Sequence, residues 1–339
     1  MEGIQLSQSD IKSVKSLLSR ITARYDSAED PDFLKEAVLY AHELPLRVRA
    51  CLNHFKLAEP ASPACIISGY PIDQAKIGKT PDHWAGQVDA ARTLEEEILL
   101  ALFSSLLGDV FGWATQQDGH IIHDVMPIRD HRNEQIGTGS EQEITWHNED
   151  AFHPCRGDYV AMMCMRNKDR VPTTIASIDS LGVDYEQLKV LFESRFVIRP
   201  DYSHSKENNS AIDNGATAHQ SAFNRMDKMI REPEKVAVLF GDRKSAYIRL
   251  DPFFMDPPDD QEARLALNTL TGLIDANLSE VVLEPGDICF IDNYKVVHGR
   301  KAFKARFDGT DRWLKRINIT RDLRKSREFR ATPLSRTVS

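Results

Sequence analysis

The chain has 339 residues, of which 41% are hydrophobic and 28% charged, a composition typical of a globular protein. Its length is sufficient for one large domain. The formal net charge of −8 argues against nucleic acid as a partner, and no apolar run reaches the roughly 18 residues of a membrane span. The five cysteines are widely spaced and the first residues do not resemble a signal peptide, so we expect a cytoplasmic protein.

The first sixty residues are expected to be helical. Residues 8 to 60 indicate two helices, the first with apolar side chains at helical spacing from Ile11 to Ile21 and the second opened by Pro31. A third helix is predicted over residues 94 to 107. The apolar stripes of the first helices could cover the rest of the domain or a second subunit, which leaves a homo-oligomer open.

Short strands dominate the remainder of the chain. Strands are predicted over residues 65–69, 143–149, 159–166, 195–199, 237–239, 246–250, 281–283, 288–293 and 314–320. One helix, predicted over residues 261 to 278, interrupts them. Many short strands separated by turns favour a mainly β fold with flanking helices (α+β), built on a double-stranded β-helix or jelly roll, with residues 1–339 as a single domain.

Two segments carry no clear strand pattern. Residues 203–235 are polar and contain no alternating run, and a loop of this length in a compact domain is usually functional. We interpret it as a lid over an active site. The Arg- and Ser-rich end of the chain, from Arg324 on, is expected to be a frayed terminus.

A candidate metal site lies at His147-Asn148-Glu149. Side chains two residues apart on a strand point to the same side, so His147 and Glu149 can share one face. Together with one distant histidine, they would form the two-imidazole, one-carboxylate set of a mononuclear non-haem iron(II) site. A His-x-Glu pair alone is a weak signal, and its weight comes from the residues that accompany it.

The accompanying pattern lies near the end of the chain. An apolar strand over residues 288–293 is followed at once by His298, and Arg312 comes fourteen residues later. The planar guanidinium of an arginine suits a carboxylate. An iron site beside a carboxylate clamp is what 2-oxoglutarate requires, because its keto-acid end chelates the metal and its far carboxylate meets the arginine.

With these motifs, the chain resembles the clavaminate-synthase-like iron(II)/2-oxoglutarate oxygenases, and more narrowly the free L-arginine β-hydroxylases of viomycin-pathway type and related basic amino acid hydroxylases. The matching segments are residues 107–119, 147–152, 198–201, 290–299 and 308–322. The resemblance implies the jelly-roll fold, Fe(II), 2-oxoglutarate and O₂, with succinate and CO₂ as products. It also implies metal ligation by His147, Glu149 and His298.

The resemblance further assigns the co-substrate and substrate contacts. Arg312 corresponds to the 2-oxoglutarate clamp, and Thr173 or Thr174 could add a hydroxyl, of which we select Thr174, although a role in strand formation is equally compatible. The substrate's α-amino and α-carboxylate groups would be held by Gln116, Glu149 and Arg316. The family's acidic pocket for the cationic end is matched by Asp201, Ser203 and Asp251.

One departure bears on the substrate. The arginine enzymes carry a second Asp two residues after the position of Asp251, where this chain has Phe253. Losing one charge-assisted bond to a guanidinium costs about 1.5–3 kcal/mol. We therefore predict hydroxylation at C3 or C4 of a free basic L-amino acid, with lysine or ornithine as plausible as arginine, and an antibiotic pathway as the setting.

Two alternatives remain at this stage. The same iron site could desaturate or cyclise an arginine-derived amino acid, which product mass would separate from hydroxylation. The chain could also be a non-catalytic jelly-roll binding protein, which the intact iron ligands and Arg312 argue against. For the remaining histidines, including His120 and His123, we predict no metal role, because they lack a third ligand nearby.

Overall fold

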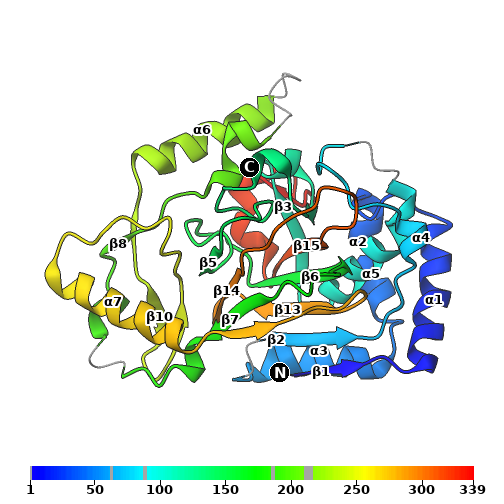
Figure 1. The fold of residues 1–339 in the computed structure, drawn as a ribbon, viewed down its shortest axis with the longest axis horizontal. Helices are drawn as coiled ribbons and strands as arrows, with labels where there is room; N and C mark the ends of the chain where they lie inside the picture. Colours follow the sequence, from blue (N-terminus) through cyan, green and yellow to red (C-terminus); the bar gives the residue numbers. More distant parts are fainter. Residues whose placement is uncertain (1, 62–63, 87–89, 185–187, 210–216) are drawn as a thin grey trace.

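Two facing β-sheets form the centre of the computed structural model, which describes residues 2–61, 64–86, 90–184, 188–209 and 217–339 (Figure 1). In the described part, the larger sheet has eight strands in the order β1-β2-β13-β6-β15-β3-β16, with β4 also paired to β15. Its strands are β1 (Glu2–Gln5), β2 (Ala64–Ser68), β3 (Asp109–Trp113), β4 (Ile122–Val125), β6 (Tyr159–Arg166), β13 (Ile288–Asp292), β15 (Trp313–Thr320) and β16 (Thr337–Val338). This confirms the predicted jelly roll.

The smaller sheet packs face to face with the larger sheet and has the order β12-β7-β14-β5. Its strands are β5 (Ile144–His147), β7 (Thr173–Ser177), β12 (Ser279–Val281) and β14 (Val296–Arg300). Two short antiparallel pairs lie outside both sheets: β8 (Phe196–Val197) with β9 (Lys235–Val236), and β10 (Leu239–Asp242) with β11 (Ser245–Ile248). Five strands and the two-residue β9 and β16 were not among the sequence predictions. The five are β1, β3, β4, β7 and β14, which are four or five residues long and carry little pattern of their own.

Alternating side chains give each sheet two apolar faces, which produces three apolar clusters: one between the sheets and one on the outer face of each sheet. Between the sheets, Met162 and Leu314 of the larger sheet pack with Ile175 and Val296 of the smaller one. The outer face of the larger sheet is covered by α1 (Gln8–Thr22), α2 (Pro31–Ala41), α3 (Leu46–Ala58) and α5 (Leu94–Ser105). The outer face of the smaller sheet is covered by α7 (Gln261–Ala276), which buries Leu270 and Ile274 against it.

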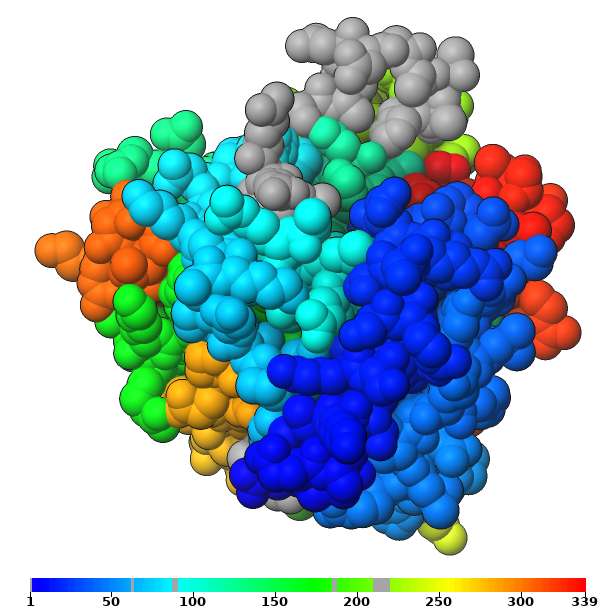
Figure 2. All heavy atoms as spheres, turned by 90° about the vertical axis from the view of Figure 1, so that its right-hand side faces the viewer, coloured from blue at the N-terminus to red at the C-terminus, as the bar shows by residue number. Residues whose placement is uncertain are grey.

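The N-terminal helices form one continuous cover, as the blue surface of Figure 2 shows. Residues 8–60 contain three helices rather than the two predicted, because the segment after α2 turns at Pro45, which is the N-cap of α3 and has no backbone N–H to continue a helix. The second helix begins as predicted, with Pro31 at its first turn and Asp30 accepting two backbone N–H groups. None of the described helices is both long enough and apolar enough to cross a membrane.

Two predictions for polar segments were wrong. The stretch 203–235 contains α6 (Thr217–Arg231), whose Phe223 and Met226 are buried, so part of the expected loop is an amphipathic helix; residues 210–216 lie outside the described part. The C-terminal segment is ordered by contacts rather than frayed. There, Arg330 is buried and donates to the carbonyl oxygens of Leu323 and Pro333, and β16 pairs with β3.

Candidate active site

A cavity of about 130 Å³ opens between the two sheets at the end where β5 and β14 meet β15. Its lining brings together side chains that are far apart in the sequence, from Trp84 to Arg316. Among the residues predicted for the site, the cavity is lined by Gln116, His147, Glu149, Asp201, Ser203, Asp251, Phe253, His298, Arg312 and Arg316. Thr174 is the one predicted residue that is not part of the lining.

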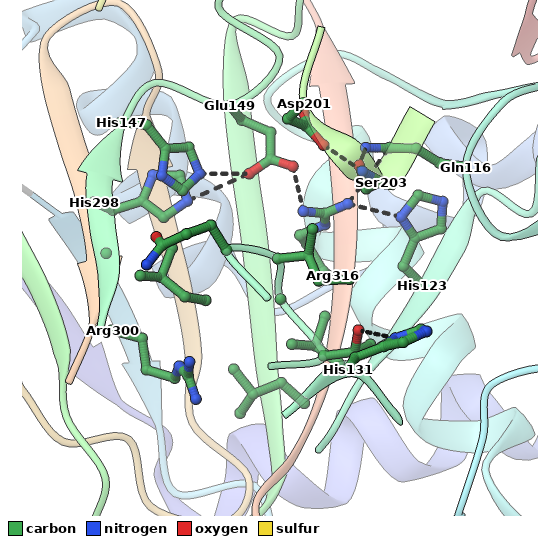
Figure 3. A pocket seen from close by; sticks show the side chains of 18 of the residues that line it. Gln116, His123, His131, His147, Glu149, Asp201, Ser203, His298, Arg300 and Arg316 are labelled. Atoms are coloured by element: carbon green, nitrogen blue, oxygen red, sulfur yellow. Dashed lines mark hydrogen bonds and ion pairs between the residues drawn. The ribbon is translucent and has the colours of Figure 1, made fainter. Parts of the chain in front are cut away.

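The three predicted metal ligands converge on one wall of the cavity (Figure 3). His147 ends β5 and His298 lies on β14, and the two residues are direct partners in the antiparallel ladder. Their imidazole centroids are 4.8 Å apart. Glu149 Oε2 lies 3.8 Å from His147 Nε2 and 3.4 Å from His298 Nε2, so one carboxylate oxygen faces both ring nitrogens.

Glu149 reaches this position by a different route from the predicted one. Strand β5 ends at His147, two residues before Glu149. The buried side chain of Asn293 instead fixes the backbone of Glu149, accepting its N–H at 2.8 Å and donating to its carbonyl oxygen at 3.0 Å. Asn148 braces the same loop by donating to the Asn293 and Val296 carbonyl oxygens. The carboxylate is therefore positioned by an asparagine clamp from the turn after β13.

The protonation of these groups fits a divalent metal ion. The Nδ1 atom of His147 lies 2.8 Å from the Thr145 carbonyl oxygen and donates to it, which leaves Nε2 to face the cavity. Burial lowers the pKa of His298 and favours a neutral ring. Burial opposes ionisation of Glu149, yet Arg316 and the two imidazoles hold its pKa well below the usual range. Burial opposes the charged form of His147, but Glu149 and Asp251 raise its pKa to about 9, so a metal ion would take the place of the proton on Nε2. Two imidazole nitrogens and one carboxylate match the facial ligand set for iron(II).

Arg312 provides a buried cation without an acidic partner. It lies directly before β15, and its Nη2 donates to Thr173 Oγ1 at 3.2 Å, while its Nε has no hydrogen-bond partner. Burial lowers the pKa of Arg312 to about 10, and no acidic side chain in the described ranges forms an ion pair with it. A buried, uncompensated guanidinium requires an anion, which suits the far carboxylate of 2-oxoglutarate.

The hydroxyl beside Arg312 belongs to Thr173 rather than to the selected Thr174. Successive residues of a strand face opposite sides, and it is Thr173 that lines the cavity. Thr174 pairs with Gly299 on β14, and an added Cβ at Gly299 would lie only 2.9 Å from Thr174 Oγ1. Thr173 is therefore the hydroxyl that shares the cavity with Arg312, whereas Thr174 packs within the sheet.

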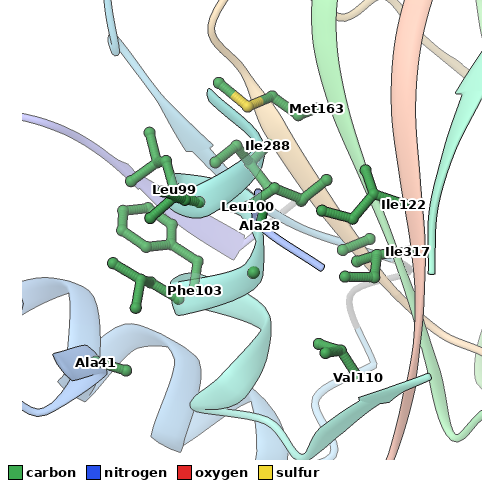
Figure 4. Close-up of a cluster of buried hydrophobic side chains, with 14 of the residues drawn as sticks. Ala28, Ala41, Leu99, Leu100, Phe103, Val110, Ile122, Met163, Ile288 and Ile317 are labelled. Atoms are coloured by element: carbon green, nitrogen blue, oxygen red, sulfur yellow. The ribbon is translucent and has the colours of Figure 1, made fainter. Parts of the chain in front are cut away.

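Strand alternation also explains how one strand supplies both arginines. Arg312, Leu314 and Arg316 face the cavity, two residues apart. The residues of β15 that alternate with them face the helices. Among these, Ile317 joins the cluster of buried apolar side chains beneath α5 (Figure 4). Lys315, on that same side, is buried and paired with Glu97 and Asp124 at 2.7 and 2.8 Å.

Arg316 and its neighbours form the polar wall opposite the imidazoles. Its Nη1 donates to Glu149 Oε1, and its Nη2 lies 3.5 Å from Gln116 Oε1. Gln116 Nε2 in turn donates to Ser203 Oγ at 2.6 Å. These contacts place Gln116, Glu149 and Arg316 together, as the family resemblance implied for the substrate's α-amino and α-carboxylate groups.

Two carboxylates give the cavity an acidic pole. Asp201 accepts the Ser203 backbone N–H at 2.8 Å, and Asp251 is buried and accepts the Phe254 N–H at 3.3 Å. Burial raises the pKa of Asp251 to about 6, and the Asp201 charge adds to this while that of His147 opposes it. Phe253 lies at the rim with 47% of its surface exposed.

Some site residues were not found from the sequence. Asp150 is buried, accepts the Trp113 indole N–H at 2.5 Å, and faces His204 Nε2 at 3.0 Å. The other ring nitrogen of His204 lies 2.7 Å from Thr115 Oγ1. This network fastens the segment that carries Asp201 and Ser203 to the loop after Glu149. The adjacency of Asp150 to the His-x-Glu pair was the only available signal, whereas His204 had none.

Two imidazoles and a carboxylate on one face of a jelly roll, beside an unpaired buried guanidinium, define the non-haem iron oxygenases that use 2-oxoglutarate. The family comparison agrees. Residues 93–318 match the model of the Taurine catabolism dioxygenase TauD, TfdA family, and the chain belongs to that family.

Known proteins resemble the whole chain. It is 44% identical to enduracididine beta-hydroxylase of Streptomyces hygroscopicus and 43% identical to L-ornithine/L-arginine 3-hydroxylase of Catenulispora acidiphila, with 100% of each chain covered. The solved structure of non-heme iron oxygenase OrfP in complex with Fe, succinate and (3S)-hydroxy-L-Arg gives a TM-score of 0.95 at 45% identity, covering 100% of both chains. The same oxygenase with Fe and alpha-ketoglutaric acid gives 0.88 at 44% identity, covering 99% of this chain and 100% of that one. This protein is a 2-oxoglutarate-dependent non-haem iron oxygenase.

Proposed function

We propose that this oxygenase hydroxylates free L-arginine or L-ornithine at C3 and releases succinate and CO₂. Two kinds of support agree. The cavity has a cationic group for an α-carboxylate, Arg316, and an acidic pole for a basic side chain. The similar proteins described above include an enduracididine beta-hydroxylase and a 3-hydroxylase of ornithine and arginine. Their names favour arginine and ornithine over lysine, which the sequence had left equally plausible.

The observation that carries the substrate class is the buried carboxylate of Asp251. Its pKa is raised by burial, and in the described ranges no lysine or arginine pairs with it. An uncompensated buried acid destabilises a protein unless a cation arrives. Asp201 lines the same cavity and raises the pKa of Asp251 further. A guanidinium or ammonium group would satisfy both carboxylates, whereas an apolar or acidic side chain would leave them unpaired.

The mechanism assigns a task to each wall of the cavity. His147, Glu149 and His298 would hold iron(II), and Arg312 with Thr173 would hold the far carboxylate of 2-oxoglutarate. When bound, iron, 2-oxoglutarate and O₂ supply the oxidising power that inserts one oxygen atom into a C–H bond as the co-substrate is converted to succinate and CO₂. Arg316 and Gln116 would orient the backbone end of the amino acid, and the acidic pole would fix its far end. Two-ended binding presents one carbon to the metal and so selects the position of attack.

We propose that the segment before α6 excludes water from the cavity. Ser203 and Asn208 line the cavity, and Asn209 donates to the carbonyl oxygens of Thr115 and Ser205. We propose that this segment acts as the cover of the site, the part of the predicted 203–235 lid that touches the cavity. A closed cover limits loss of the reactive state to solvent.

The direct test is turnover by anaerobically prepared, iron(II)-loaded enzyme with 2-oxoglutarate and O₂ against a panel of free L-amino acids. We expect succinate release with L-arginine or L-ornithine and a product heavier by one oxygen atom. A product lighter by two hydrogen atoms would establish desaturation. Absence of turnover with every free basic amino acid would refute the proposal.

A further inference from the structure

His123 supplies a contact to Arg316 to which no role has been assigned. Arg316 lies on β15 directly opposite His123 of β4 on one side and Met162 of β6 on the other. Its Nη2 is 2.9 Å from His123 Nδ1, while the thioether of Met162 offers only a weak acceptor. Figure 3 shows the guanidinium of Arg316 between Glu149 and the ring of His123.

The hydrogen-bond pattern fixes the tautomer of His123. Its Nε2 lies 2.9 Å from the His120 carbonyl oxygen, which can only accept, so Nε2 carries the proton. Its Nδ1 then presents a lone pair to the guanidinium, which can only donate. Burial and the nearby Arg316 charge lower the pKa of His123 to about 3, and the ring is neutral. The residue is 2% exposed and thus has no competing contact with solvent.

We infer that His123 is a positioning residue for the amino-acid substrate, a neutral acceptor that holds the Arg316 guanidinium in the orientation that receives the α-carboxylate. This inference rests on the proposed function and deepens it. The Nη1 atom of Arg316 carries two N–H groups and donates one to Glu149, so the guanidinium still has a donor to offer an incoming anion.

Neutrality is the important property of this contact. A carboxylate in place of His123 would also orient Arg316, but it would cancel the charge that attracts the substrate. Glu149 contacts the same guanidinium, yet its charge is balanced when the metal is bound. His123 and the more distant Gln116 are neutral, so their contacts orient the guanidinium without cancelling the positive charge that the substrate meets.

The test compares two substitutions at this position with a control. His123→Phe keeps a ring and removes the acceptor, and His123→Asn places an amide oxygen near the position of Nδ1. His153→Phe serves as the matched control, because His153 is another buried neutral histidine whose Nδ1 accepts a backbone N–H, that of Cys155. For each holoenzyme, KM for the amino acid, KM for 2-oxoglutarate, kcat, iron affinity and Tm are measured.

We expect His123→Phe to raise KM for the amino acid about tenfold, with KM for 2-oxoglutarate and iron affinity within about twofold of the wild type. His123→Asn should recover most of that loss, and His153→Phe should lower Tm without raising KM. Two results for His123→Phe would overturn the inference while leaving the proposed function intact. One is an equal change in KM for the amino acid, KM for 2-oxoglutarate and iron affinity, and the other is an unchanged KM for the amino acid. A wild-type enzyme that turns over no basic amino acid would overturn both.

Discussion

Replacing Asp251 by Asn is expected to weaken substrate binding and to stabilise the substrate-free protein at once. Asn keeps the size of the side chain and can still accept the Phe254 N–H. It loses the charge that a guanidinium or ammonium group would meet. Exchanging a charge-assisted hydrogen bond for a neutral one costs about 1.5 kcal/mol, so KM for the amino acid should rise about tenfold.

The gain in stability follows from the pKa of Asp251, which burial raises from 3.8 to about 6. Between these values the folded protein holds a proton that the unfolded chain has released, so the free energy of unfolding falls as pH rises through this window and stays constant above it. At about 1.4 kcal/mol per pKa unit, the ionised acid costs about 3 kcal/mol at neutral pH. The unpaired amide of Asn costs about 1–2 kcal/mol. The variant should therefore gain about 1–2 kcal/mol at neutral pH and lose that advantage near pH 4.

The free energy of unfolding is measured by denaturant unfolding of the metal-free wild type and Asp251→Asn, at about pH 4.5 and about pH 7.5. KM for the amino acid is measured by steady-state kinetics of the iron-loaded forms. Metal-free protein is required because a bound cation beside His147 would itself lower the pKa of Asp251. A variant that is less stable than wild type at neutral pH would refute the claim that burial makes the charge of Asp251 destabilising. An unchanged KM would refute its role at the substrate's cationic end.

Four further variants test the rest of the site. Arg312→Ala leaves a buried carboxylate of 2-oxoglutarate unpaired, a loss of about 3–5 kcal/mol, and KM for 2-oxoglutarate should rise at least a hundredfold; a change below tenfold would exclude it as the clamp. Thr173→Ala should raise the same KM about fivefold and Thr174→Ala by less than twofold, and the reverse order would restore Thr174 to the site. Asn293→Ala removes three buried hydrogen bonds, two of them to Glu149, and should lower the free energy of unfolding by about 2–4 kcal/mol and iron affinity by about ten- to a hundredfold. Chemical denaturation and equilibrium iron titration measure these two losses, and full iron affinity in that variant would contradict the clamp.

The parts of the site that could be predicted from sequence are those encoded by local spacing. The His-x-Glu pair, His298 and Arg312 are separated by fixed intervals, and the two-residue period of β15 places Arg316 on the same face as Arg312. Long periodic helices such as α5 and α7 were also predicted to within two residues at their ends. Each of these features is encoded within one segment of the chain and does not depend on the segments that pack against it.

The remainder depends on contacts between distant segments. His123 received no role because its meaning arises only when β4 pairs with β15 and brings it opposite Arg316. Thr173 and Thr174 are indistinguishable until the register of β7 against β14 decides which one faces inward. The end of the chain appeared solvated by composition, yet carbonyl groups of its own turn satisfy Arg330.

The pairing of His147 with His298 across one rung of the β5–β14 ladder has a consequence for metal selectivity. The distance between the two imidazoles is set by backbone hydrogen bonding, so the ligand pair exists before any ion arrives. Such a preformed set of two nitrogens and one carboxylate also suits other first-row divalent ions, whose affinities rise from manganese through iron to copper. Nickel or copper at equal free concentration would outcompete iron here. The identity of the bound metal is therefore decided by the supply of each ion in the cell, not by the strength with which the protein binds it.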